Sequence, residues 1–204
     1  MRLYYSPLSA NSRRAVMAVL QLRAPVELVR VDLPKREHKQ PPFLKMNPAG
    51  RVPVLEDEGF CLPESHAIMA YVADNTPGQT LYPTQLRERA RVNQWMFWSA
   101  HHFTPAISVL NWERVVKPMI GLGDPDPNEL QRGERLVTET AGLLDAHLAG
   151  RQWISGPDLT LADLSIAAPL MSTVPAKLPV AGFANLQAWF ARVQALDAWR
   201  KSAS

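Results

Sequence analysis

The sequence predicts a chain in two parts, an α/β first half and an all-helical second half. In residues 1–77, short β-favouring runs alternate with runs of helical periodicity, whereas every strong periodic signal after residue 86 is helical. Between the two parts, Thr76-Pro77-Gly78 and Tyr82-Pro83-Thr84 contain the residue types that end helices and form loops. We therefore expect domains at residues 1–77 and 87–204, with a linker over residues 78–86.

The first half has the pattern of a β-α-β unit followed by two strands and a helix. We expect strands at residues 3–5, 26–31, 52–56 and 59–62. Helices are expected after Ser12, a candidate N-cap, and over Glu64–Asn75. The strand–helix–strand order predicts a parallel pair of strands joined by a crossover helix.

The second half contains several typical helix starts. A run over residues 87–103 has apolar residues at helical spacing. Asp126-Pro127-Asn128-Glu129 predicts an N-cap, a first-position proline and a glutamate that bonds back to the cap. Thr160 and Asp163 form a capping box before an uncharged, buried helix, which Pro169 is expected to kink. A last amphipathic helix is expected over residues 186–193.

Composition excludes several classes of protein. Of 204 residues, 47% are hydrophobic and 20% charged, which is typical of a soluble globular protein. The net charge of +3 and the absence of a basic block argue against nucleic-acid binding. No apolar run reaches the roughly 20 residues that span a bilayer. The single cysteine, Cys61, excludes an internal disulfide and fits a reducing compartment, so we expect a cytoplasmic protein without a membrane partner.

The most informative stretch is Asn47–Leu55, which is followed by Glu64-Ser65 at a helix start. Asn-Pro and Gly50 predict a turn, and Pro53 stands where a buried strand begins. The residues alone leave open whether the bond before Pro53 is cis. The free N–H groups of a helix start suit an anionic ligand group, and Glu64 suits a cationic one. A plain helix N-cap with nothing bound is the alternative.

Four motifs together resemble the cytosolic glutathione S-transferases over essentially the whole chain. They are Ser6–Arg14, Glu37-His38-Lys39 with Phe43-Leu44, Asn47–Pro53 with Pro63–Ile68, and the Thr160/Asp163 capping box. The first is similar to the loop of the serine-type members of the phi, delta and theta classes, and it implies a bacterial member of this type. Delta-class members carry a histidine where this chain has Gly50.

The resemblance implies a thioredoxin-like first domain that binds glutathione and a helical domain that binds a hydrophobic co-substrate. Pro53 would be cis and present the backbone of Val52 to the cysteinyl unit. A carboxylate and a hydroxyl would hold the γ-glutamyl end, and cationic residues the glycine carboxylate. The residues implied in glutathione binding are His38, Lys39, Arg51, Val52, Pro53, Glu64 and Ser65. A homodimer formed through the helices that begin at Glu64 and Arg87 is implied as well.

Ser9 is the predicted catalytic residue. A thiol like that of glutathione has a pKa of about 8.5, and lowering it by about two units requires roughly 2.7 kcal/mol. A hydrogen bond from a hydroxyl to the thiolate supplies about 1.5–3 kcal/mol, and a nearby helix N-terminus about 0.3–1 kcal/mol. These two effects suffice without a general base or a metal. Asn11 is a possible second donor, and the alternatives are that Ser9 bonds only to local backbone or that Tyr5 takes the role.

The co-substrate is expected to contact aromatic and apolar residues, with core or dimer contacts as the alternative. The candidates are Leu8, Trp98, His101, His102, Phe103 and Trp112. The two neighbouring histidines point about 100° apart on a helix, so they make a poor metal pair.

The predicted function is transfer of glutathione to an electrophilic, hydrophobic small molecule. Two alternatives remain open at this point: a non-catalytic ligand-binding or interaction protein with the same fold, or a glutathione-dependent isomerase, dehalogenase or peroxidase. A disulfide oxidoreductase requires a C-x-x-C pair, which this chain with its single cysteine lacks.

Overall fold

A computed structural model describes residues 1–203 and divides the chain into two compact units. The first unit contains Met1–Pro83 together with the C-terminal segment from Gln194, and the second contains Thr84–Val193. The sequence predicts a helical domain over residues 87–204, whereas the segment from Gln194 belongs to the first unit. The chain thus returns to the first unit at its end, a feature that no local sequence pattern indicates.

A four-stranded mixed sheet forms the centre of the first unit. The strands are β1 (Arg2–Tyr5), β2 (Glu27–Arg30), β3 (Val54–Asp57) and β4 (Phe60–Pro63), in the order β2-β1-β3-β4. β1 pairs parallel with β2 and antiparallel with β3, and β3 pairs antiparallel with β4. The predicted parallel pair is therefore confirmed. Pro53 lies just before β3, where no ladder hydrogen bond is required of it.

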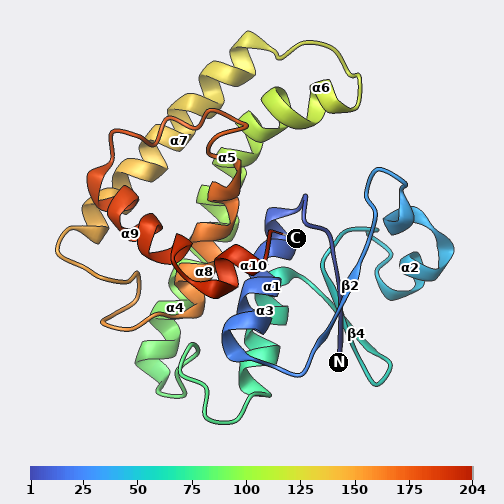
Figure 1. Ribbon diagram of the computed structural model, residues 1–204. Helices are drawn as coiled ribbons and strands as arrows, with labels where there is room; N and C mark the ends of the chain where they lie inside the picture. The colour runs from blue at the N-terminus through green and yellow to red at the C-terminus, as the bar shows by residue number, and fades with distance from the viewer. Residues whose placement is uncertain (204) are drawn as a thin grey trace. The chain divides into compact units, whose positions relative to one another are not determined.

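Helices cover both faces of this sheet. α1 (Ala10–Leu22) and α3 (Ser65–Asp74) lie on one face and the short α2 (Pro41–Met46) on the other (Figure 1). Successive strand residues point to opposite faces. Leu3 of β1 is fully buried with the residues of α1 and α3, whereas its neighbour Tyr4 packs with Phe43 of α2. Each face therefore has its own small apolar core.

The C-terminal helix α10 (Asp197–Lys201) packs against α1 within the first unit. The guanidinium of Arg13 lies 3.7 Å from the centroid of the Trp199 ring. It also donates to the hydroxyl of Ser202 at 3.2 Å and to the carbonyl of Trp199 at 3.1 Å. These contacts compensate for the burial of Arg13, which is only 8% exposed.

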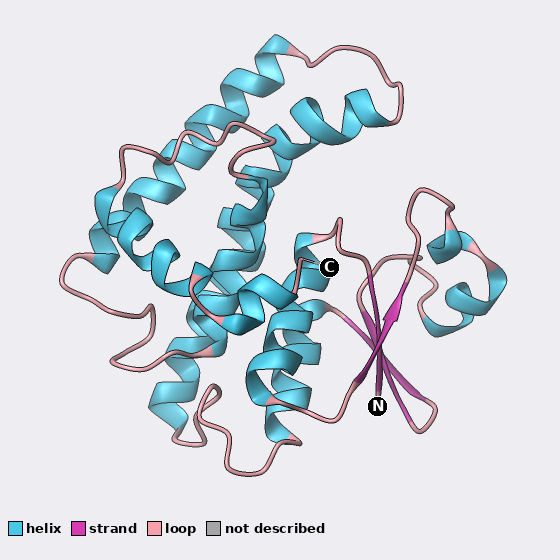
Figure 2. Cartoon of the chain, viewed as in Figure 1, coloured by secondary structure: helices cyan, strands magenta, loops and turns pink. Residues whose placement is uncertain are grey.

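The second unit is entirely helical (Figure 2). Its helices are α4 (Leu86–Trp98), α5 (Thr104–Asn111), α6 (Lys117–Met119), α7 (Pro127–Leu148), α8 (Leu161–Ala167) and α9 (Ala184–Gln194). The run predicted over residues 87–103 does not end there, because two π-helical turns, Ser99–Phe103 and Trp112–Val116, connect α4, α5 and α6. No helix within residues 1–203 is both long and apolar enough to cross a membrane.

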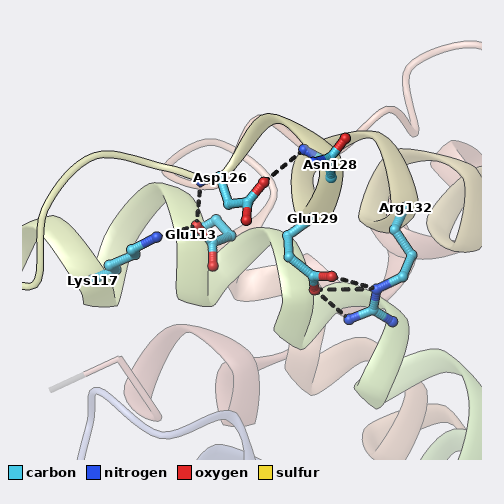
Figure 3. A network of polar contacts seen from close by, with 6 residues as sticks. All are labelled: Glu113, Lys117, Asp126, Asn128, Glu129 and Arg132. Atoms are coloured by element: carbon cyan, nitrogen blue, oxygen red, sulfur yellow. Dashed lines mark hydrogen bonds and ion pairs between the residues drawn. The ribbon is translucent and has the colours of Figure 1, made fainter.

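The start of α7 corrects one detail of the predicted capping. Asp126 is the N-cap and its carboxylate accepts from the N–H of Asn128 at 2.8 Å. The carboxylate that bonds back to the N–H of Asp126, at 2.7 Å, is Glu113 and not Glu129 (Figure 3). Glu129 instead binds Arg132 one turn along α7. The partner comes from a distant helix, so sequence spacing does not reveal it.

α8 begins at the predicted capping box and is buried on all sides, as expected from its uncharged sequence. The carboxylate of Asp163 accepts from the N–H and the hydroxyl of Thr160, from the N–H of Ile154 and from the indole of Trp189, at 2.9–3.1 Å. Pro169 lies in a 3-10 turn, Ala168–Ser172, that follows the end of α8 at Ala167.

Candidate active site

Six of the predicted site residues line one cavity of about 360 Å³ in the first unit. The lining comes from the start of α1, the segment before α2 and the loop before β3. The residues are Ser9, Asn11, Leu33, His38, Lys39, Gly50, Arg51 and Val52. Leu33 and Gly50 were not predicted as site residues. No acidic residue lines the cavity, so its potential is positive and favours an anionic ligand.

Ser9 is the N-cap of α1, which corrects the assignment of that role to Ser12. Its hydroxyl oxygen accepts from the N–H of Ser12 at 3.2 Å, three residues along the chain. Ser12 is fully buried, and its own hydroxyl accepts from the N–H of Ser6 at 3.1 Å. The two hydroxyls thus fix the loop before α1 through adjacent hydrogen bonds.

The capping bond of Ser9 uses an oxygen lone pair and leaves its hydroxyl proton available. The expected alternative, a serine bonded to local backbone, is therefore observed, and it is compatible with donation into the cavity. A hydroxyl that accepts a hydrogen bond becomes a better donor through polarisation. The first-turn N–H groups of α1 also give this end of the cavity a partial positive charge. Asn11, in the same turn, is exposed and lines the cavity.

The loop before β3 is shaped by Asn47, which is buried and was not predicted as a site residue. Its side-chain oxygen accepts from the N–H of Ala49 at 3.1 Å, and its amide donates to the carbonyl of Arg51 at 2.8 Å. These bonds hold the backbone that carries Arg51 and Val52 at the cavity. The Asn-Pro pair predicted a turn here, and the side-chain bonding of such a turn is the signal that would have identified Asn47.

Gly50 allows Lys39 to lie closely over this loop. Gly50 has a φ of +57°, a left-handed conformation that other residues adopt only with strain. A Cβ at this position would lie 2.8 Å from the Lys39 amine and 2.9 Å from the carbonyl of His38. The amine donates to the carbonyl of Ala49 at 3.2 Å. Because Gly50 has no side chain, the Lys39 amine has room to lie beside the cavity.

His38 lies next to Lys39, and its surroundings favour the neutral imidazole. Partial burial and the charges of Lys39 and Arg36 lower the pKa of its imidazole. Its Nδ1 atom is buried and has no hydrogen-bond partner within residues 1–203. Such a group is available to a ligand that brings its own donor or its own negative charge.

The bond between Val52 and Pro53 is cis, as the family resemblance implies. Val54 pairs with Pro63 in the antiparallel register of β3 and β4. The segments Val52-Pro53 and Glu64-Ser65 therefore leave the sheet at the same end. Glu64 is exposed, with a φ of 72°, and Ser65 is the buried first residue of α3. Neither of these two residues lines the cavity.

Arg14 of α1 is a buried cation within the Ser6–Arg14 motif. It is 1% exposed, and its Nη1 atom lies 3.0 Å from Nε2 of His66 on α3. Burial lowers the pKa of the Arg14 guanidinium to about 10, and the charge of Glu64 acts in the opposite direction. The pair links α1, which carries Ser9, to the start of α3.

The remaining candidate residues do not line the cavity around Ser9. Tyr5 packs against the core shared by α1 and α3, and Cys61 is half-buried in β4. Phe103 is fully buried and stacks on Trp98 with ring centroids 5.5 Å apart, so Phe103 is a core residue of the helical unit. His101 and His102 are exposed, as are Leu8 and Trp112. No cluster of three metal-ligating side chains occurs within residues 1–203.

The fold and site define a class of protein: a thioredoxin-like domain with a cationic cavity beside a cis-proline loop, and an all-helical domain. Comparison with known proteins identifies the same class. The family model of the glutathione S-transferase N-terminal domain matches residues 1–74, and that of the glutathione S-transferase C-terminal domain matches residues 127–192. The chain is 32% identical to glutathione S-transferase 3 of Zea mays, over 99% of this chain and 92% of the relative.

Similarity extends to an animal relative and to solved structures. Theta-2B glutathione S-transferase of Homo sapiens is 32% identical over 96% of this chain and 81% of its own. The crystal structure of glutathione transferase F7 from Populus trichocarpa has a TM-score of 0.90 at 30% identity, over 99% of this chain and 97% of its own. The chain belongs to the glutathione S-transferase family and is an enzyme of that family.

Proposed function

We propose that the protein transfers glutathione to an electrophilic, hydrophobic small molecule, with Ser9 as the hydrogen-bond donor that stabilises the thiolate. The observation that carries this proposal is the convergence of Ser9, Asn11, His38, Lys39 and Arg51 on one cavity without an acidic residue. Glutathione presents two carboxylates and one thiol, and a cationic cavity at a helix N-terminus is complementary to these groups.

The cationic part of the cavity would hold the glycine carboxylate of the tripeptide. Lys39 and Arg51 carry the positive charge, and His38 offers a buried nitrogen beside them. The backbone of Val52, next to the cis bond before Pro53, would pair with the cysteinyl unit, and Glu64 and Ser65 would receive the γ-glutamyl end. A related structure, glutathione S-transferase-I bound with the ligand lactoylglutathione, has a TM-score of 0.87 at 27% identity, over 99% of this chain and 97% of its own, and supports a tripeptide ligand here.

The mechanism requires only a lowered thiol pKa and an oriented thiolate. The Ser9 hydroxyl donates to the glutathione sulfur while its oxygen keeps the bond from Ser12 N–H. The N-terminus of α1 adds a favourable field. Together these effects supply roughly the 2.7 kcal/mol that makes the thiolate prevalent at neutral pH. The thiolate then attacks the electrophile, the new carbon–sulfur bond forms, and the leaving group or adjacent atom takes the electron pair.

Replacing Ser9 by alanine tests the role of the hydroxyl. We expect kcat to fall about 10- to 100-fold, the value of one hydrogen bond to a charged sulfur, with little change in glutathione affinity. The ultraviolet thiolate band of bound glutathione, titrated against pH, should shift towards the free thiol value. Because Ser9 also caps α1, its removal costs about 0.5–2 kcal/mol of stability, which thermal unfolding measures separately.

Ser9→Thr and Ser9→Asn separate the two functions of this residue. Threonine keeps the cap and the hydroxyl, so it should retain most of the activity; asparagine keeps a good cap but replaces the hydroxyl. Unaltered turnover in the alanine variant, or equal loss in the threonine and asparagine variants, would refute the donor role.

We also propose that the protein is a homodimer. Large apolar side chains are exposed on both units: Phe60 of β4 is 51% exposed, and Leu86 and Phe97 of α4 are 81% and 59% exposed. A partner that packs over these side chains would remove them from water, as in the dimer that the family resemblance implies. Phe97→Glu should convert the dimer to monomers in sedimentation equilibrium. The wild-type protein sedimenting with the mass of one chain would contradict the proposal.

A further inference from the structure

A cavity of about 400 Å³ lies within the helical unit and includes none of the residues assigned to glutathione or to the co-substrate. Its walls come from α4, from the C-terminal end of α7 and from the loop that follows α7. The side chains that matter here are Arg91, Gln94, Trp95, His147, Arg151 and Ser155. The volume lies in the range of sites that bind small organic molecules.

The cavity carries two positive charges and no negative one. Arg91 and Arg151 both line it, and no aspartate or glutamate does. Within residues 1–203 neither guanidinium forms an ion pair, whereas three other arginines of this unit do: Arg114 with Glu134, Arg132 with Glu129 and Arg135 with Glu139. Two like charges facing one cavity repel each other, and a bound anion removes this repulsion.

The Trp95 indole forms one wall of the cavity, and neighbouring rings pack against it. The Trp95 ring lies against the His147 ring, with centroids 4.3 Å apart, and also contacts Trp98 at 5.2 Å. Nε2 of His147 is hydrogen-bonded to the carbonyl of Ile154 at 2.8 Å, which holds the imidazole in place. An indole held in this way is a surface for a planar apolar group.

The loop after α7 supplies an unused polar group. The Ser155 hydroxyl is buried and has no hydrogen-bond partner within residues 1–203, which is uncommon for a buried polar atom. Rotation about its Cα–Cβ bond turns the hydroxyl, so it is able to donate to an anion in the cavity. Gln94 offers an exposed side-chain amide from α4. Charged and neutral donors therefore surround the same space.

We propose that this cavity binds a small organic oxyanion, a phosphate, sulfate or carboxylate group attached to an aromatic ring. Arg91 and Arg151 contact the charged group from opposite elements, α4 and the loop after α7. The ring lies against Trp95. The site is distinct in residues and in charge pattern from the cavity around Ser9, and its occupancy involves no covalent step.

Isothermal titration calorimetry with phenyl phosphate tests this site. We expect saturable binding in about the millimolar range or tighter, as two partly exposed charge-assisted contacts provide, and weaker binding as salt is raised. Inorganic phosphate should bind several-fold more weakly because it lacks the ring. Arg91→Gln and Arg151→Gln should each lower the affinity for phenyl phosphate about 5- to 10-fold.

Two matched controls exclude other binding places. Arg87→Gln removes the same charge from an exposed position on α4 outside the cavity, and Arg51→Gln removes a cation from the cavity around Ser9. The cavity around Ser9 is also cationic and attracts anions, so the comparison concerns the binding step that Arg91→Gln and Arg151→Gln weaken. Neither control should change this step. Equal losses in Arg87→Gln and Arg91→Gln, or loss of this step in Arg51→Gln, would overturn the proposal, as would the absence of saturable heat.

Further variants separate loss of the site from loss of the fold. Arg91→Lys and Arg151→Lys keep the charge, so they should retain more affinity than the glutamine variants. Thermal unfolding of every variant shows whether the helical unit is intact. Equal affinity for phenyl phosphate and inorganic phosphate, or unchanged affinity in Trp95→Leu, would overturn the role of the aromatic wall.

Discussion

At the scale of single residues, the serine at position 9 is the N-cap of α1 and also lines the cavity, so the proposed donor role and a bond to local backbone are compatible. Its oxygen caps α1 and its proton remains available to a ligand. The sequence predicts a catalytic role for Ser9, which stays a prediction, and it assigns the cap to Ser12, because spacing alone does not distinguish two nearby serines. The hydrogen bond from the N–H of Ser12 to the hydroxyl of Ser9 shows that Ser9 is the N-cap.

The titration of His38 makes the free energy of unfolding depend on pH, and the direction of its pKa shift fixes the sign of this dependence. Partial burial and the neighbouring cations lower the pKa of His38 in the folded protein, while the unfolded chain has the ordinary value of about 6.5. As the pH falls through this value, the unfolded chain takes up a proton first, so the free energy of unfolding decreases. Chemical unfolding at pH 8 and at pH 5.5, compared between wild type and His38→Gln, measures the effect.

Replacement of His38 by glutamine should make the decrease in stability over this pH interval smaller. Arg36 and Lys39 are the cations that face His38, and both remain in the variant, so the difference reports the imidazole alone. Identical pH dependences in the two proteins would show that the pKa of His38 is the same in the folded and unfolded states.

At the scale of elements, α8 depends on one buried carboxylate. Asp163 accepts four hydrogen bonds, and they link the start of α8 to Ile154 and to Trp189 of α9. Burial raises the pKa of Asp163, and these donors oppose that shift. The capping box that the sequence predicts accounts for only the Thr160 bonds. The others join residues far apart in the chain, which local pattern does not indicate.

Asp163→Asn should be strongly destabilising. The amide would place N–H donors where Thr160 also donates, so at least one buried donor would lose its acceptor. We expect the free energy of unfolding to fall by about 2–4 kcal/mol and the melting temperature by about 5–15 °C. Differential scanning calorimetry measures both. Asp158→Asn, at an exposed position of the preceding loop, is the control and should change neither value.

At the scale of the whole molecule, the sequence predicts what local pattern and family resemblance determine. All four strands, the parallel β1–β2 pair and the helical second unit follow from periodicity and from turn residues. The residues that gather around Ser9 follow from the motifs that the chain shares with its relatives. Contacts between distant segments, such as Glu113 with Asp126 and Arg13 with Trp199, depend on tertiary packing and are absent from the prediction.

The C-terminal segment makes the most extensive of these contacts between distant parts of the chain. Its removal should destabilise the first unit. A chain that ends at Gln194 loses Trp199 and Ser202, so the buried guanidinium of Arg13 loses two hydrogen bonds and an aromatic ring. We expect the free energy of unfolding of this unit to fall by about 3 kcal/mol, and glutathione binding to be lost at a lower temperature. Binding measured by calorimetry over a temperature series reports the first unit specifically.

A shorter truncation, after Ser202, is the matched control because it keeps every contact to Arg13. Trp199→Ala in the full chain should reproduce part of the loss, since it removes the ring but leaves the backbone carbonyl and Ser202. If the chain ending at Gln194 binds glutathione over the same temperature range as the full chain, α10 does not stabilise α1. The return of the chain to the first unit would then be a consequence of packing with no energetic role for Arg13.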